Sequence, residues 1–261
     1  MDLRQGLEFH HGRQNPLMRI GGGHQSALCP PCPLSMTSLQ AVFWDVDGTL
    51  ADTEMDGHRP AFNATFEELN LPFFWDEPLY AELLAVPGGL KRVQHHAISC
   101  GMELSTEQLA QIRDRKRTHY CRRALEGAIR IRPGVRRLLG ELNARGIDQW
   151  IVTSSGRASV DALFAGQRGL ERHFNGIVTA DDVPNGKPAP DGYCQARNLS
   201  GHEATSILTI EDSEAGFQAS AAAGLSCLLT PSPWEKELPT RFTDAAAAFD
   251  HLGDPDQPMH Q

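Results

Sequence analysis

The sequence predicts an α/β fold: a parallel sheet into which an all-helical segment is inserted after the first strand. Short apolar runs alternate with helical patterns along residues 133–252, and such alternation is typical of parallel sheets covered by helices on both faces. No strand-like run occurs between Glu54 and Leu125. Polar clusters follow the expected strands, at the sheet edge where ligands bind in such folds.

Composition and charge narrow the classes of function. The 261 residues can form one large domain or two small ones, and 40% hydrophobic with 22% charged residues is typical of a globular protein. The net charge of −9 disfavours non-specific binding to nucleic acid. No apolar run approaches the length needed to span a membrane. We therefore expect no nucleic-acid partner and no membrane partner. We also expect a monomer.

The cysteines indicate a reducing compartment. Only Cys29 and Cys32 form a C-x-x-C pair, and they lie in a Pro-rich segment without the context of a redox or zinc motif. The other four are scattered singly, which favours free thiols: Cys100, Cys121, Cys194 and Cys227. We expect a cytoplasmic protein.

Shifts in composition divide the chain. The first residues carry Gly21-Gly22-Gly23 and Pro30-Pro31 without sustained periodicity, and Met36 lies just before the first strand. We expect a disordered extension at 1–38, a core domain made of 39–53 and 126–252, a helical cap domain at 54–125 and a tail at 253–261.

The first strand is the apolar run Val42-Phe43-Trp44. Helical spacing follows from Asp56 to Asn70, with Pro60 allowed only in the first turn. Two shorter helices are expected, over Tyr80–Val86 and Lys91–Ser99. Ser105 and Gln108 resemble a capping box that opens a helix through about Leu125.

The second half alternates between strands and helices. We expect strands at Trp150–Val152, Ile177–Val178, Ile207–Ile210 and Cys227–Leu229. Helices are expected over Val135–Gly146, around Val160–Phe164, and over Pro190–Leu199, Glu214–Ala223 and Asp244–Leu252.

Asp45 and Asp47 follow the first strand and are the starting point for function. Side chains two residues apart on a strand point the same way, so the two carboxylates start on one face. Gly48 then allows a sharp turn. Holding two anions together is costly, and a divalent cation with a preference for hard oxygen ligands, such as Mg²⁺, removes that cost.

Three other expected strands end in polar groups that could converge on this pair. Thr153 and Ser154 could bind phosphoryl oxygens through a hydroxyl and a backbone N–H. Lys187 offers a positive charge to a phosphate and to an attacking carboxylate. Glu211 and Asp212 would complete a cation site begun by Asp45 and the main-chain carbonyl of Asp47.

This set suits phosphoryl transfer, which needs positioning and neutralised charge. Asp45 could attack phosphorus and form an aspartyl phosphate, and Asp47 could act as general acid and then as general base. Taken singly, each cluster is more often a helix cap or a solvated loop. Their order, each after a strand, favours a shared site.

The chain resembles the haloacid dehalogenase superfamily of Mg²⁺-dependent phosphohydrolases. The resemblance rests on Asp45-Val46-Asp47-Gly48-Thr49, Thr153-Ser154, Lys187-Pro188-Ala189-Pro190-Asp191, and Glu211-Asp212-Ser213 with Gly216. It covers about residues 38–250 and implies a Rossmann-like core with an inserted helical cap. It also implies the roles given above for these motif positions.

A closer resemblance is to the CbbY-type branch of that superfamily. It rests on Ala51-Asp52-Thr53-Glu54, Asp56-Gly57-His58-Arg59, Ala61-Phe62-Asn63, Trp75-Asp76, Tyr80, Leu83-Leu84-Ala85-Val86 and Gly88-Gly89. It implies hydrolysis of xylulose 1,5-bisphosphate, an inhibitor of the carbon-fixing carboxylase of the Calvin cycle. It also implies that Glu54, His58, Lys91 and Arg92 contact the sugar and its second phosphate. Pro87 and Leu90 depart from that branch's loop.

Four alternatives stay open at this point. A β-phosphoglucomutase-like mutase shares the four motifs and the helical cap, and other sugar-phosphate phosphatases share them too. A dehalogenase of the same fold needs neither Mg²⁺ nor a second aspartate, so Asp47 disfavours it. A binding module that has lost catalysis is disfavoured because every candidate catalytic group is present.

Overall fold

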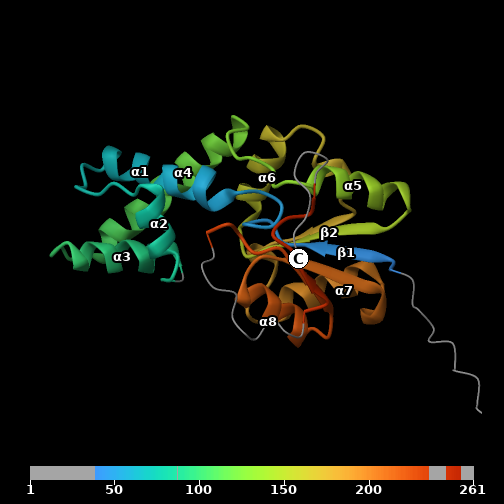
Figure 1. The fold of residues 1–261 in the computed structure, drawn as a ribbon. Coiled ribbons are helices and arrows are strands. Elements are labelled where there is room, and N and C mark those ends of the chain that lie inside the picture. The colour runs from blue at the N-terminus through green and yellow to red at the C-terminus, as the bar shows by residue number, and fades with distance from the viewer. Residues whose placement is uncertain (1–38, 87, 235–244, 254–261) are drawn as a thin grey trace, which may run out of the picture. The chain divides into compact units, whose positions relative to one another are not determined.

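The computed structural model describes residues 39–86, 88–234 and 245–253. The predicted extension, 1–38, the Cys29–Cys32 pair, and all but the first residue of the predicted tail, 253–261, lie outside these ranges. The strands are β1 (Ala41–Trp44), β2 (Asp148–Val152), β3 (Gly176–Val178), β4 (Ile207–Glu211), β5 (Ser226–Leu229) and β6 (Ala247–Ala248). They form one parallel sheet in the order β3-β2-β1-β4-β5-β6 (Figure 1).

Helices cover both faces of the sheet. Val42 and Trp44 of β1 pack in one apolar cluster with α5 (Val135–Ala144) and α6 (Arg157–Gly166). Ala41 and Phe43 pack in another with α7 (Asp191–Ser200) and α8 (Glu214–Ala222), because successive side chains of a strand point to opposite faces. Figure 1 shows the two helix pairs on opposite sides of the sheet. The predicted α/β architecture is confirmed.

The segment inserted after β1 is helical. A π-helical turn at Thr53–His58 leads into α1 (Arg59–Glu68), α2 (Glu77–Leu83), α3 (Gly89–Ser99) and α4 (Thr106–Leu125). The described residues between 53 and 125 contain no strand. Pro60 lies in the first turn of α1, and Ser105 forms a capping box with Gln108, both as predicted.

This segment has an apolar cluster of its own, built around Trp75. The fully buried Trp75 ring lies 4.9 Å from the ring centroids of both Phe62 and Phe66 and 5.5 Å from that of Tyr80. The Asn63 side chain holds the Trp75 main chain with two hydrogen bonds of 2.8 Å, one donated and one accepted. The cluster supports our proposed division into a core of 39–53 and 126–252 and a cap of 54–125.

Contacts at both ends of the inserted segment join it to the rest of the fold. A Cβ placed on Gly166, at the end of α6, would lie 1.8 Å from the carbonyl oxygen of Ala124 in α4, so the two backbones touch there. Asp56, in the first inserted turn, is held from two sides. Arg123 Nε at the end of α4 donates to its carbonyl oxygen at 2.8 Å, and Arg130 Nε, beyond α4, donates to its carboxylate at 2.8 Å.

The predicted last helix is wrong. Residues 245–253 contain the short strand β6 and no helix. The alanine-rich sequence favours a helix locally, but Ala246 N donates to the Cys227 carbonyl oxygen at 2.8 Å and Phe249 N donates to that of Leu229 at 2.9 Å. Pairing with the sheet edge overrides intrinsic propensity. No helix in the described residues is both long and apolar enough to cross a membrane.

The cluster around Trp75 gives a stability prediction. Trp75→Ala should lower the free energy of unfolding by about 3–5 kcal/mol, because a large buried ring leaves a cavity. The matched control is Phe74→Ala, since the Phe74 side chain is 70% exposed and its loss should cost about 0.5 kcal/mol or less. Urea unfolding measures both, and equal losses for the two variants would contradict the prediction.

Candidate active site

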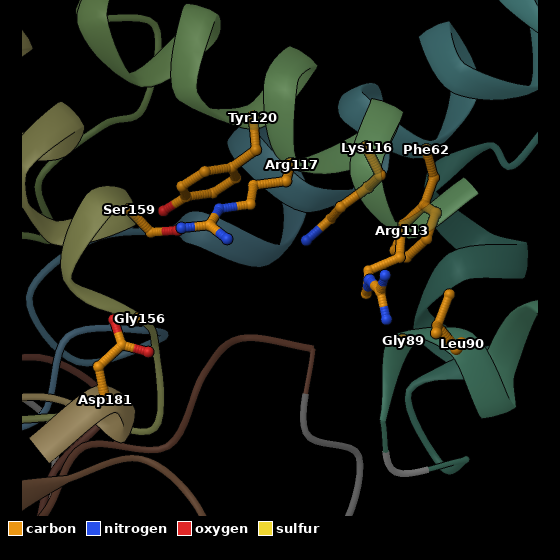
Figure 2. A pocket seen from close by; sticks show the side chains of 10 residues that line it. All are labelled: Phe62, Gly89, Leu90, Arg113, Lys116, Arg117, Tyr120, Gly156, Ser159 and Asp181. Atoms are coloured by element: carbon orange, nitrogen blue, oxygen red, sulfur yellow. The ribbon is translucent and has the colours of Figure 1, made fainter. Parts of the chain in front are cut away.

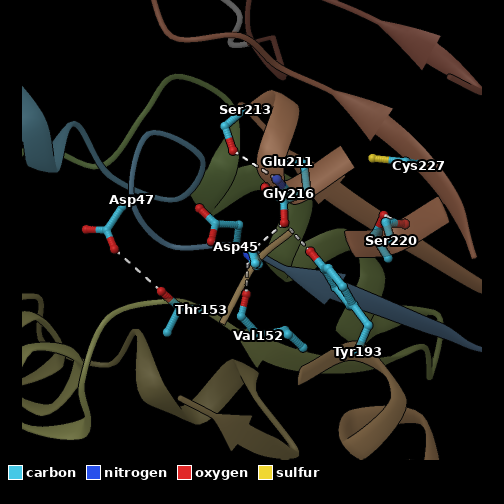
Figure 3. A network of polar contacts seen from close by, with 12 residues as sticks. Asp45, Asp47, Val152, Thr153, Tyr193, Glu211, Ser213, Gly216, Ser220 and Cys227 are labelled. Atoms are coloured by element: carbon cyan, nitrogen blue, oxygen red, sulfur yellow. Dashed lines mark hydrogen bonds and ion pairs between the residues drawn. The ribbon is translucent and has the colours of Figure 1, made fainter. Parts of the chain in front are cut away.

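A buried lysine joins the ends of three neighbouring strands. Asp45 follows β1, and its N–H donates to the Ile210 carbonyl oxygen of β4 at 3.0 Å, which places it beside Glu211. Lys187 Nζ lies 2.5 Å from Asp45 Oδ1, 2.6 Å from Glu211 Oε1 and 2.8 Å from the Val152 carbonyl oxygen at the end of β2. Figure 3 shows this network where the strands end. Asp45, Lys187 and Glu211 therefore lie together at the ends of these strands.

The Glu211 carboxylate is fully buried and only partly satisfied. Its Oε1 accepts from the Tyr193 hydroxyl of α7 and faces Lys187. Its Oε2 has no hydrogen-bond partner among the described residues. A Cβ on Gly216 would lie 1.9 Å from Oε2, so the first turn of α8, capped by the Ser213 hydroxyl, leaves room for this carboxylate.

Asp212 belongs to the same cluster, and Gly48 leaves the space that its carboxylate occupies. Gly48 has φ +82°, and a Cβ there would lie 1.8 Å from Asp212 Oδ2. Only glycine combines this backbone angle with so close an approach. Asp45, Glu211 and Asp212 can each offer an oxygen within 4.8 Å of the others.

The cluster carries more negative charge than its lysine offsets. Burial raises the pKa of Asp45 to about 8, against the lowering effect of Lys187. Burial also raises the pKa of Asp212, and Asp45 and Glu211 add to the shift. Burial opposes the charge on Lys187, but Asp45 and Glu211 outweigh it and raise the pKa of the amine. One ammonium cannot offset three ionised carboxylates, which adds to the rise in the pKa values of Asp45 and Asp212. The donor set and the unpartnered Glu211 Oε2 therefore fit a divalent cation with hard oxygen ligands.

Asp47 lies apart from this cluster and has partners of its own. Its Oδ2 accepts from the Ser155 hydroxyl at 2.6 Å and faces the Thr153 hydroxyl at 3.4 Å. Its Oδ1 lies 3.6 Å from His58 Nε2. Burial raises the pKa of Asp47, but the nearby His58 and the Ser155 hydroxyl outweigh it and hold that pKa below its usual range. Asp47 is therefore ionised in this state.

Lys116 of α4 contacts the ring nitrogen of His58 that does not face Asp47. Lys116 Nζ lies 2.8 Å from His58 Nδ1, and the imidazole lies 4.5 Å from the Tyr120 ring centroid. Lys116 and Asp47 therefore contact opposite ring nitrogens of one imidazole. Burial lowers the pKa of Lys116, while Glu54 and Asp47 oppose that shift.

A cavity of about 280 Å³ opens beside the carboxylates. Its lining includes Asp45, Asp47, Glu54, Leu84, Arg92, Ser154, Lys187, Asp212, Ser213, Ala215 and Ser232. Glu54 Oε2 accepts from the Tyr80 hydroxyl at 2.6 Å, and the buried Arg92 donates to the same hydroxyl at 2.9 Å. Glu54 and Arg92, whose Oε2 and Nη1 atoms are 3.7 Å apart, are therefore held together through Tyr80 in the lining of the cavity. Their contact with the substrate stays a prediction.

A second pocket, of about 330 Å³, is lined by basic residues of α4. Arg113, Lys116 and Arg117 line it, and Figure 2 shows their side chains pointing into the opening. Gly156 and Ser159 of the first turn of α6 line the opposite wall, with Asp181 beside them. Three cations against one carboxylate suit an anionic ligand.

The structure brings together most of the predicted site residues. Asp45, Lys187, Glu211 and Asp212 meet, Asp47 and Thr153 face each other, and Ser154, Glu54 and Arg92 line the cavity. His58 contacts Asp47 rather than the cavity. Lys91 is exposed and lines neither pocket.

Sequence reasoning missed Ser155, Lys116, Tyr193 and Arg132. Ser155 directly follows the predicted Thr153-Ser154 pair, but a run of hydroxyls does not indicate which one turns inward. Lys116 lies among several basic residues of α4. No sequence signal distinguishes it, since the contact that matters joins it to residue 58.

Comparison with known proteins adds a family. The sequence profile described as haloacid dehalogenase-like hydrolase matches residues 39–224. Protein CbbY, plasmid, of Cupriavidus necator is 38% identical over 233 residues, which cover 85% of this chain and 89% of that protein.

Solved structures give the same picture. CbbY from Rhodobacter sphaeroides in complex with phosphate has a TM-score of 0.71 and 32% identity, covering 82% of this chain and 95% of that one. A variant of the same protein, solved in complex with xylulose 1,5-bisphosphate, has a TM-score of 0.71 and 31% identity over the same shares.

The close approach at Gly48 gives a prediction for the carboxylate cluster. Gly48→Ala should displace Asp212 and abolish hydrolysis. The control is Gly201→Ala, where φ is +72° but nothing lies within 4 Å of a Cβ, so both variants share backbone strain of about 1–2 kcal/mol. Thermal unfolding and turnover are measured for both variants. An active Gly48→Ala enzyme would contradict the assigned packing.

Proposed function

The chain belongs to the haloacid dehalogenase-like hydrolase family and is a phosphatase, and we propose that it removes one phosphate from a small sugar bisphosphate. The best candidate is xylulose 1,5-bisphosphate, which is the ligand in the R. sphaeroides CbbY complex. One observation carries the proposal: the carboxylate cluster and the basic pocket lie on either side of the contact between Asp47, His58 and Lys116.

We propose that the carboxylate cluster holds Mg²⁺. Asp45, Glu211 and Asp212 would supply side-chain oxygens, and Asp47 its main-chain carbonyl. Glu211 also holds Lys187, so its Oε2 is the oxygen left for this purpose. When bound, the cation neutralises phosphoryl oxygens and keeps the buried carboxylates ionised at neutral pH.

In the proposed reaction Asp45 attacks the phosphorus of the substrate. A P–O bond forms to the Asp45 carboxylate, the bond to the sugar oxygen breaks, and that oxygen takes a proton from Asp47. Water then attacks the aspartyl phosphate, and Asp47 accepts a proton from this water. Inorganic phosphate is released and the Asp45 carboxylate is regenerated. Lys187 stabilises the charge on the phosphoryl oxygens and on Asp45 throughout.

The surroundings of Asp47 suit both of its proposed tasks. In the described state it is ionised, which is the form that accepts a proton from water. A phosphate dianion in the cavity would raise the pKa of Asp47, because like charges disfavour ionisation. Ser155 and His58 fix the carboxylate in place through both transfers.

The basic pocket would hold the second phosphate. Lys116 lies one imidazole ring away from Asp47, so a short phosphorylated sugar could reach from the reaction centre to the cations of α4. Arg113 and Arg117 are arginines, which bind phosphate with two parallel hydrogen bonds. The pocket therefore favours a bisphosphate over a monophosphate. We thus propose the second phosphate at Arg113, Lys116 and Arg117, whereas the sequence resemblance implied Glu54, His58, Lys91 and Arg92 for the sugar and this phosphate.

A phosphate-release panel tests the function. Xylulose 1,5-bisphosphate, ribulose 1,5-bisphosphate, sugar monophosphates and β-glucose 1-phosphate are incubated with enzyme and Mg²⁺. We expect the fastest release from xylulose 1,5-bisphosphate and none in the presence of a chelator. Conversion of β-glucose 1-phosphate to the 6-phosphate without release would instead identify a mutase.

Asp45→Asn is the control for that panel. It keeps the size of the side chain and removes the nucleophile, so release should stop while the unfolding temperature and circular dichroism stay close to those of the parent. Release at the parent rate would remove Asp45 from its proposed role.

The basic pocket gives a prediction with a matched pair of variants. Arg113→Gln should raise KM for the bisphosphate by about tenfold, because one charge-assisted hydrogen bond is lost, with kcat nearly unchanged. Arg115→Gln is the control: the two side chains are 61% and 57% exposed, but only Arg113 lines the pocket. Neither variant should change KM for a sugar monophosphate. A similar rise in KM for the bisphosphate in both variants would contradict the proposal that this pocket binds the second phosphate.

A further inference from the structure

Arg132 is a buried arginine that none of the steps above uses. It lies between α4 and α5, and its side chain is buried, with 7% of its surface exposed. Its Nη2 donates to the carbonyl oxygens of Pro231 at 2.9 Å and Asp250 at 3.0 Å. Its Nη1 donates to the carbonyl oxygens of Gly48 and Thr230. One planar guanidinium thus gathers three chain segments that are far apart in sequence.

Two of these segments directly contact the carboxylate cluster. Gly48 directly follows Asp47, and its Cα faces the Asp212 carboxylate. Thr230 N donates to the Glu211 carbonyl oxygen at 2.7 Å. The main chain of Arg132 also contacts the loop after β1, since its N–H donates to the Leu50 carbonyl oxygen at 2.9 Å. The distance between the loop after β1, which contains Gly48, and the Glu211-Asp212 pair at the end of β4 therefore depends on Arg132.

We propose that Arg132 is a positioning residue that sets this distance and with it the affinity of the cluster for a divalent cation. The inference rests on the proposed cation site. The planar fork of an arginine can bridge several carbonyl oxygens at fixed angles, and a lysine cannot reproduce this. Loosening the Gly48 peptide would let Asp212 retreat from Asp45 without removing any ligand.

The test is Mn²⁺ binding, followed by electron paramagnetic resonance on the purified full chain. Arg132→Lys and Arg132→Gln should each weaken Mn²⁺ binding by about tenfold or more, the usual effect of losing an outer support of a metal site. Asp212→Asn should abolish the same binding and so identify the site. Urea unfolding of each variant is recorded alongside.

The matched control is Arg137→Lys. Arg137 also donates to main-chain carbonyl oxygens of the last described segment, those of Leu252 and Gly253, but it makes no contact with Gly48. It should lose stability and keep the parent affinity for Mn²⁺. A purely structural role for Arg132 predicts the same pattern for its own variants, so folded Arg132 variants with parent affinity would overturn the inference.

Two further outcomes complete the test. If both Arg132 variants fail to fold, Thr230→Val, which deletes only the hydroxyl 3.3 Å from Nη1, decides the question: weaker Mn²⁺ binding supports the inference and parent affinity overturns it. A parent that binds Mn²⁺ through Asp212 but releases no phosphate would overturn the proposed function alone. A parent that binds no Mn²⁺ would overturn the inference as well.

Discussion

The site depends on one buried ammonium, that of Lys187, placed between Asp45 and Glu211. A parallel sheet brings β1, β2 and β4 together with their carboxyl ends at one edge, so carboxylates that follow two of these strands come close without being near in sequence. Without a cation between them these groups would repel each other at low dielectric. Lys187 offsets part of that repulsion. The remainder makes the cluster incomplete and suits it to a divalent cation.

The two aspartates after β1 acquire different properties from their neighbours. Asp45 faces Lys187 and two other carboxylates, and burial raises its pKa. Asp47 faces Ser155 and His58, which hold its pKa low. Two residues of the loop after one strand thus have opposite shifts in pKa, and divergent environments of this kind are how proteins separate a nucleophile from an acid–base group.

The sequence predicted the sheet and the convergence of Asp45, Lys187 and Glu211 because strand ends and polar clusters are local signals. It could not predict features that depend on a distant contact. The alanines near residue 247 favour a helix locally but pair with β5. Lys91 and Lys116 are equivalent as basic helix residues, yet only Lys116 faces the site. Arg132 could not be recognised, because its acceptors are main-chain oxygens that carry no residue identity.

The backbone contact between Gly166 and Ala124 has a mechanical consequence for ligand binding. It fixes one end of α4, so the helix can tilt about that point while its other end moves. Eight residues separate Ala124 from Lys116, which puts the amine's position about 12 Å along the helix axis. A tilt of about 10° about the contact shifts that position by about 2 Å. A tilt of this size would change the width of the basic pocket and leave the carboxylates at the sheet in place.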